Sequence, residues 1–392
     1  MIWSYTKIAF RNLVRYSSFS LINILGLSIG LSASLLIALW VFDELSYDKF
    51  HENSEQIYRV ERHINFDGKI FDVPVTGAIY APTIKKDVPE VFEYTRVYPI
   101  ELSVQNHMND NQEERVMFCD KGFFNVFTFP LEQGNQETAL AEPFSVVLTK
   151  QAALAYFGEE YPMDKSLEIE WGDERKKFRV TGILADIPTQ NHFQFDVLGS
   201  FESIEELMPE RLDTWVSNYL YSYVLLHKDA TYEDAKPKLM KIVEDHISPA
   251  YIAFLGDDAK IENIHDIYQI TFRPIENIHL DSNLMWDIAP QGNMTSVYTF
   301  SIVSILILVM ACFNFMNLST ALGSKRSREV GIRKTSGASR IQLIVQFLGE
   351  TTVIALISLI IALIIIEITL PGFNAFTDKS LTLSSFLIPG YF

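Results

Sequence analysis

The 392-residue sequence lacks the short motifs that mark several common catalytic sites. It contains no GxxxxGK[ST] loop, which excludes an ATPase of the P-loop type. The HExxH pattern and paired CxxC spacings are also missing, so the sequence offers none of the familiar zinc sites. These absences disfavour an enzyme, and we expect no catalytic residues and no metal ligands in this chain.

Cysteine is scarce, with only Cys119 and Cys312. Cys312 lies in the middle of a long apolar run, whereas Cys119 lies in a mixed, polar region, so the two are not expected to pair. A disulfide framework is therefore excluded, and the region around Cys119 must fold by its own hydrophobic core.

Charge is absent from two long stretches of the chain. Residues 19–42 and residues 298–322 contain no charged side chain, and residues 351–370 contain only Glu367. A bilayer core about 30 Å thick needs roughly 20 helical residues, so each run is long enough to span a membrane. A cleaved signal peptide is the alternative for the first run, but its apolar stretch exceeds the usual 7–15 residues.

The distribution of basic residues predicts the orientation of these spans. The chain has a net charge of −17, yet residues 1–18 carry +3 and residues 324–343 carry +5. Short basic segments stay in the cytoplasm. We therefore expect a multi-pass membrane protein with a cytoplasmic N-terminus and residues 43–297 outside the cytoplasm. The simplest alternative for the basic loop is that it only sets this topology.

The predicted fold is an α-helical transmembrane protein with a large α+β extracytoplasmic domain inserted between the first and second spans. Residues 1–18 resemble an amphipathic helix on the inner membrane surface, although a frayed, charged terminus is the alternative. The predicted parts are that helix (1–18), the first span (19–42), the extracytoplasmic domain (43–297), the second span (298–322), a cytoplasmic loop (323–342), the third span (343–370), and an extracytoplasmic segment that begins a fourth span (371–392).

Small and amide side chains indicate where the spans pack. Gly26, Gly30 and Ser34 recur at every fourth residue, a spacing that lets helix backbones approach closely, although it also arises by chance. Asn314 and Asn317 lie on one side of the second span and are expected to bond neighbouring helices. A packing role is favoured over a transport pathway.

Local patterns in residues 43–297 predict alternating strands and helices. Thr149 is placed as the N-cap of a helix that stops at Gly158, after the strand 144–148. Residues 172–175, Gly-Asp-Glu-Arg, form a turn between two alternating segments, as in a hairpin. Thr231 and Asp234 have the spacing of a capping box. His192 and His279 are isolated, so we expect structural roles for both.

The basic loop also carries a recognisable pattern. "RSREVGIRKTSGASRIQLIVQFLGE", residues 326–350, closely resembles the signature of the FtsX-like, or MacB/LolC-LolE type, ABC transporter permeases. In that family this stretch forms a short cytoplasmic coupling helix that docks on a separate ATP-binding subunit. The resemblance assigns that role here to Arg328, Glu329, Val330, Gly331, Ile332, Arg333, Lys334, Gly337 and Ala338.

The resemblance covers nearly the whole chain. "EPFSVVLTKQAALAYFG" and "FRVTGILADIPTQNHFQFDVLGSF" look like the MacB-like periplasmic core domain of Bacteroidetes-type members. Family halves have four spans, whereas this sequence stops at "SSFLIPGYF", so the resemblance implies the first half of a longer permease or a truncated chain. No ATPase is fused to it, so ATP and Mg²⁺ would be bound by a partner.

The resemblance implies a permease subunit in the bacterial inner membrane, with residues 43–297 in the periplasm. Such a subunit couples ATP hydrolysis to movement of its periplasmic domain, a process called mechanotransmission. Implied partners are a cytoplasmic ABC ATPase, a second permease half or homodimer partner, membrane lipid and an optional periplasmic adaptor, but no nucleic acid. No cofactor is expected in this chain. The cargo, typically a lipoprotein, peptide or antibiotic, and its direction of movement stay open. A membrane-anchored sensor with a periplasmic ligand-binding domain is the alternative.

Overall fold

The computed structural model of the chain describes residues 17–66, 68–105, 111–255, 263–281, 284–325, 327–337 and 339–383. The chain divides into two compact units, one of them interrupted in sequence by the other. We call Met1–Leu45 with Met294–Phe392 the helical unit, and Ser46–Asn293 the inserted domain. The predicted class, long apolar helices with an inserted α+β domain, is confirmed.

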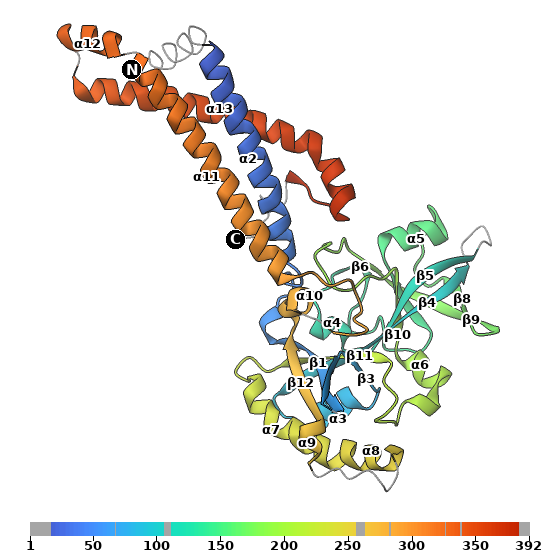
Figure 1. Cartoon of the computed structure of the whole chain (residues 1–392). Helices are drawn as coiled ribbons and strands as arrows, with labels where there is room; N and C mark the ends of the chain where they lie inside the picture. The colour runs from blue at the N-terminus through green and yellow to red at the C-terminus, as the bar shows by residue number, and fades with distance from the viewer. Residues whose placement is uncertain are drawn as a thin grey trace. The chain divides into compact units, whose positions relative to one another are not determined.

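Three helices of the helical unit are long and apolar enough to cross a membrane (Figure 1). They are α2 (Ser17–Leu45), α11 (Met294–Lys325) and α13 (Arg340–Thr377). A shorter helix, α12 (Ser327–Thr335), lies between α11 and α13 in the sequence. Residues 1–16 lie outside the described residues, so the predicted amphipathic helix is described only at Ser17 and Ser18, which belong to α2.

The three long helices extend beyond the predicted spans. Helix α2 includes Asp43 and Glu44, which follow the predicted first span. Helix α11 begins at Met294, whereas the predicted second span begins at residue 298. The third helix runs from Arg340 through Pro371 to Thr377, so residues 371–377 are helical instead of forming a separate segment. Apolar runs underestimate such helices because backbone hydrogen bonding continues into polar residues that cap each span.

The inserted domain is built on one mixed sheet. Its main path runs β12-β1-β11-β4-β5-β10-β7-β9-β6, with β2 on β1, β3 on β11, and β8 between β4 and β9. Within the described residues, β10 is parallel to β5 and β7 to β9, while the other pairs are antiparallel. The strands are β1 (Ile57–Phe66), β2 (Lys69–Val73), β3 (Val75–Thr76), β4 (Val91–Gln105), β5 (Asn111–Cys119), β6 (Leu131–Gly134), β7 (Ser145–Leu148), β8 (Ser166–Trp171), β9 (Glu174–Leu184), β10 (Val197–Ser200), β11 (Leu220–Leu226) and β12 (Tyr268–Pro274).

Short helices cover this sheet and complete three hydrophobic clusters. One cluster is rich in phenylalanine and includes Phe123, Phe127, Phe129 and Phe193, all nearly inaccessible. The helices of the domain are α3 (Tyr80–Asp87), α4 (Phe123–Val126), α5 (Lys150–Phe157), α6 (Glu202–Leu207), α7 (Tyr232–Ile242), α8 (Ser248–Leu255), α9 (Ile264–Ile267) and α10 (Ile278–Asp281). Cys119 is buried in the same phenylalanine-rich cluster and is not disulfide-bonded.

Several local predictions are confirmed in this domain. The Thr149 hydroxyl accepts the backbone N–H of Ala152 at the start of α5, and Gly158 ends that helix with φ of 59°. Strands β8 and β9 form the predicted hairpin, with Trp171 opposite Glu174 across the turn. Thr231 and Asp234 make the reciprocal hydrogen bonds of a capping box at α7. These motifs could be predicted because each depends only on neighbours in the sequence.

Candidate functional site

The segment singled out by sequence folds as α12 and its C-terminal turn. Gly337 lies after the helix with φ of +92°, a left-handed conformation that favours glycine, and its N–H donates to the Lys334 carbonyl oxygen at 3.2 Å. Ser339 then begins α13 with a capping box, because its hydroxyl accepts the N–H of Gln342 and the Gln342 side chain accepts the N–H of Ser339. The described residues thus end α12 in a turn at Gly337 and begin α13 with a capping box at Ser339.

The described side chains of α12 leave an apolar residue exposed between basic positions. Ile332 is 60% exposed and Lys334 is exposed, while Val330 is half-buried. A Cβ placed on Gly331 would meet no described atom within 4 Å, so the packing of this chain does not require a glycine there. Of the other predicted residues, Arg328, Glu329 and Arg333 lie in the helix by their backbone, and Ala338 is outside the described residues.

The predicted small-residue seam of α2 lies against α11. A Cβ on Gly30 would be 2.4 Å from the Cβ of Ala311, and one on Gly26 would be 3.0 Å from Nδ2 of Asn314. Ser34 continues the row, with its hydroxyl 3.0 Å from that of Ser304. The backbones of α2 and α11 therefore approach at a distance that only small residues allow. The other predicted amide, Asn317, is exposed on α11.

A second contact of α2 was not predicted. The Ser28 hydroxyl donates to the Ser358 carbonyl oxygen of α13 at 3.0 Å, and both serines are inaccessible. Two serines far apart in the sequence gave no periodic signal, which is why sequence reasoning missed them. Because Ser28 bonds α13 while Gly30 meets α11, α2 is the central helix of the three.

A cluster of charged side chains lies beyond the apolar parts of α2 and α13 in the helical unit. Lys379 Nζ lies 2.8 Å from Glu44 Oε1 and 3.0 Å from Asp43 Oδ2, and the two acidic side chains are only 6% and 5% exposed. The Asn374 side chain holds the same turn through both backbone groups of Leu381. Asp378, the residue before this lysine, is the left-handed C-cap of α13.

The isolated histidines of the inserted domain occupy structural positions. His192 is 2% exposed and lies between Asp48 and the Tyr223 hydroxyl, at 2.8 and 2.9 Å from its two ring nitrogens. His279 stacks on Tyr47 with ring centroids 3.5 Å apart. Nearby, burial lowers the pKa of His51 to about 4. In the described part of the chain, His, Cys, Asp and Glu form no cluster that could hold a metal ion.

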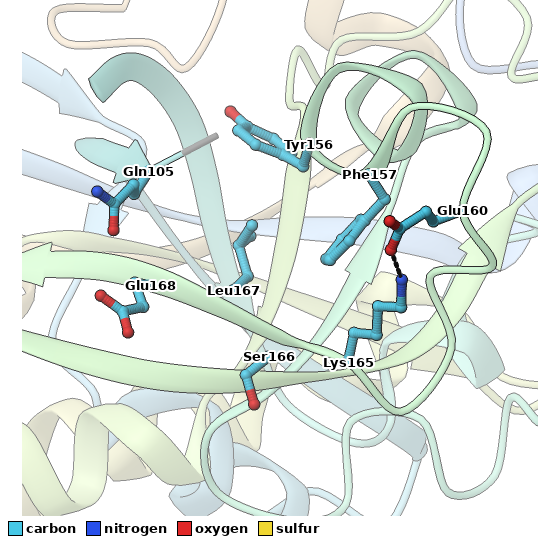
Figure 2. A pocket seen from close by; sticks show the side chains of 8 residues that line it. All are labelled: Gln105, Tyr156, Phe157, Glu160, Lys165, Ser166, Leu167 and Glu168. Atoms are coloured by element: carbon cyan, nitrogen blue, oxygen red, sulfur yellow. Dashed lines mark hydrogen bonds and ion pairs between the residues drawn. The ribbon is translucent and has the colours of Figure 1, made fainter. Parts of the chain in front are cut away.

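The inserted domain also has a surface groove of about 530 Å³ (Figure 2). Its lining combines aromatic, apolar and charged side chains: Gln105, Tyr156, Phe157, Glu160, Lys165, Ser166, Leu167 and Glu168. Lys165 is paired with Glu160 across one end, so the one cation of this lining is already neutralised. The groove could accept a small molecule, but its described groups include no catalytic arrangement.

Comparison with known proteins places these parts in a family. Residues 20–242, more than half of the chain, match the MacB-like periplasmic core domain, and residues 301–392 match the FtsX-like permease C-terminal region. The chain belongs to the FtsX/MacB-type family of ABC transporter permeases. The resemblance predicted from the sequence is thereby confirmed.

Individual relatives are distant or match only in part. An uncharacterized ABC transporter permease, YknZ of Bacillus subtilis, is 40% identical over 68 residues, which is 17% of each chain. The solved domain of a putative permease from Porphyromonas gingivalis is 18% identical, with a TM-score of 0.47 over 57% of this chain and 91% of that one. The periplasmic region of MacB from Actinobacillus actinomycetemcomitans is 15% identical, with a TM-score of 0.35 over 56% and 90%.

Proposed function

We propose that this FtsX/MacB-type chain is the force-transmitting permease subunit of an inner-membrane ABC transporter. In this proposal a separate cytoplasmic ATPase binds ATP and Mg²⁺, docks on α12, and moves the long helices when it closes. The inserted domain lies in the periplasm and handles lipoprotein, peptide or antibiotic-like cargo. A second permease half or a second copy completes the membrane part, which is surrounded by lipid, and a periplasmic adaptor is an optional partner.

The exposed Ile332 of α12 carries this proposal. An isoleucine that is 60% exposed, next to a glycine with open space around it and to the exposed Lys334, gives a small apolar patch in a segment whose sequence is basic. Such a patch suits a groove on a partner protein, with the surrounding charges orienting the helix. A loop that only set the topology would need the basic residues but not this apolar patch.

The test is recovery of ATP hydrolysis with the purified full-length chain. We expect the wild-type chain, extracted in mild detergent from its native host, to retain an ATPase whose hydrolysis is measured in the eluate. Ile332→Glu should reduce the recovered activity at least tenfold, because a carboxylate would be desolvated in the proposed groove. Ile70→Glu is the matched control, since Ile70 is 61% exposed on β2 of the inserted domain.

Two outcomes contradict the proposal. Equal ATPase recovery with wild type and Ile332→Glu would show that α12 is not the docking element. Recovery of no ATPase with the wild type under conditions that preserve the fold would remove the proposed subunit role. The alternative, a membrane sensor, would need a ligand-dependent change in the groove lined by Phe157 and Leu167, which is measurable separately.

A further inference from the structure

Two connecting segments join the inserted domain to the long helices in sequence. The first, residues 46–51, follows α2, and the second, residues 284–293, precedes α11. Each is held inside the domain by a buried tyrosine of the same strand, β11. Tyr221 and Tyr223 are two residues apart, so their side chains lie on one face of that strand.

Tyr223 holds the first connecting segment through His192. Asp48 Oδ1 accepts hydrogen bonds from the backbone N–H of His192 at 3.1 Å and from its Nδ1 at 2.8 Å. A carboxylate can only accept, so Nδ1 donates to Asp48, and the other ring nitrogen, Nε2, is hydrogen-bonded to the Tyr223 hydroxyl at 2.9 Å. The Asp48 side chain has no exposed surface, and the Tyr223 side chain is likewise inaccessible.

Tyr221 and Arg59 hold the second connecting segment. The Tyr221 hydroxyl donates to the Trp286 carbonyl oxygen at 2.7 Å. Arg59 binds Asp287 with both terminal nitrogens, at 2.6 and 3.1 Å. Arg59 lies directly opposite Tyr223 in the β1–β11 pairing, so the contacts to both segments meet at one point of the sheet.

His279 ties the two segments together at a second place. Its ring stacks on Tyr47 of the first segment, with an interplanar angle of 5°. Its backbone carbonyl oxygen accepts the N–H of Gly292, in the second segment, at 2.8 Å. Because most of these groups are shielded from water, separating them would leave buried polar atoms without partners, and the segments are expected to move with the sheet.

We propose that Tyr221 and Tyr223, with Arg59, Asp287, His192 and Asp48, form a joint through which displacement of α2 and α11 reaches β1 and β11. This inference rests on the proposed function, because the displacement is supplied by the ATPase. The joint goes beyond the proposed function because it names the residues of the inserted domain that receive this motion. None of the six was selected for this role by the sequence, since their contacts span up to 228 positions.

The test measures hydrogen–deuterium exchange in the full chain with its co-purified ATPase in lipid nanodiscs, with and without ATP. The double variant Tyr221→Phe/Tyr223→Phe removes both hydroxyls and keeps both rings in the core. We expect about tenfold faster exchange in residues 46–51 and 284–293 than in the wild type, since each lost hydrogen bond weakens the attachment modestly. Exchange in β4 and β5 should be unchanged, which verifies folding.

In the wild-type complex, ATP should change exchange in β1 and β11, whereas in the double variant that change should be lost although the same amount of ATPase is bound. Tyr219→Phe is the matched control, because the Tyr219 hydroxyl makes an exposed contact to the Arg211 carbonyl oxygen. Asp287→Asn is a second variant, and it tests the contact between Arg59 and Asp287 alone.

The outcomes separate this inference from the proposed function. Capture of no ATPase by the wild type removes the proposed function and the joint with it. If the wild type captures the ATPase but hydrogen–deuterium exchange in the connecting segments is the same in the double variant as in the wild type, only the joint is rejected. The joint is also rejected if the double variant transmits the ATP-dependent change to β1 and β11 as the wild type does, or if ATP leaves those strands unaffected in the wild-type complex.

Discussion

Gly30 of α2 faces Ala311 of α11 so closely that a Cβ added to the glycine would lie 2.4 Å from that of the alanine. Contact at this distance requires one of the two helices to shift. The observed α2–α11 packing therefore leaves no room for a methyl group at position 30, and this relationship can be tested by exchanging the two residues.

Gly30→Ala should destabilise the helical unit by about 1–3 kcal/mol, because it overpacks the α2–α11 contact. Thermal unfolding of the full chain in detergent, followed by loss of monodisperse protein, would measure this. Gly349→Ala in α13 is the matched control, since a Cβ there meets no described atom within 4 Å. The swap Gly30→Ala/Ala311→Gly should restore stability; a swap no better than Gly30→Ala would contradict the direct contact.

Lys379→Met should lower the stability of the helical unit by about 3–5 kcal/mol, the usual cost of removing one partner of a buried ion pair. The reason is that Asp43 and Glu44 would keep their buried carboxylates and lose the ammonium beside them. Denaturant titration of the full chain measures the loss. Lys165→Met, which removes an exposed pair with Glu160, should cost less than about 1 kcal/mol. Similar losses for the two variants would refute the buried cluster.

Stability of the inserted domain should fall as the pH is lowered from 6.5 towards 4, because burial lowers the pKa of His51 from 6.5 to about 4. In that window the unfolded chain binds a proton at His51 and the folded chain does not, so acid favours unfolding. The expected contribution is about 3 kcal/mol, fully lost below pH 4.

The measurement is unfolding of the full chain against pH, followed by tryptophan fluorescence. His51→Asn is the informative variant, since the His51 Nδ1 accepts the N–H of Thr128 at 3.0 Å and an amide oxygen can replace that acceptor. The variant should show a shallower pH dependence between 4 and 6.5. An unchanged slope would assign the acid sensitivity to other groups.

A cysteine at Lys334 should be protected from a membrane-impermeant thiol reagent in intact cells and should react after lysis. The reason is the predicted cytoplasmic location of α12, which follows from its basic residues. A cysteine at Lys177, a 72% exposed side chain on β9, should react in intact cells because it lies in the inserted domain. Both cysteine variants are made in a Cys312→Ala background. Reaction of the cysteine at position 334 before lysis would contradict the predicted orientation of the chain in the membrane.

Sequence reasoning succeeded where the signal is local or periodic. The apolar runs predicted three long helices, and neighbouring residues predicted the caps at Thr149 and Thr231 and the turn at Gly172. The family signature also predicted a helix at α12. Helix ends were less accurate, because polar residues such as Asp43 are held in the helix by a partner 336 positions away, Lys379.

Contacts between distant residues could not be predicted. The Ser28–Ser358 bond and the bonds of His192 to Asp48 and Tyr223 join segments that only the folded chain brings together. His192 was correctly expected to be structural, yet a single histidine in a sequence carries no information about its partners.

The position of β1 between β11 and β12 has a consequence for biosynthesis. During synthesis, residues 57–66 have only the short hairpin partner β2 until residues 220–274 emerge. At roughly 5–20 residues per second, this strand waits on the order of 10–40 seconds with one edge unpaired and the other paired only at residues 62–66. A newly made chain is therefore vulnerable to aggregation and proteolysis during this interval, and its yield in cells should depend on holding chaperones in the compartment where this domain folds.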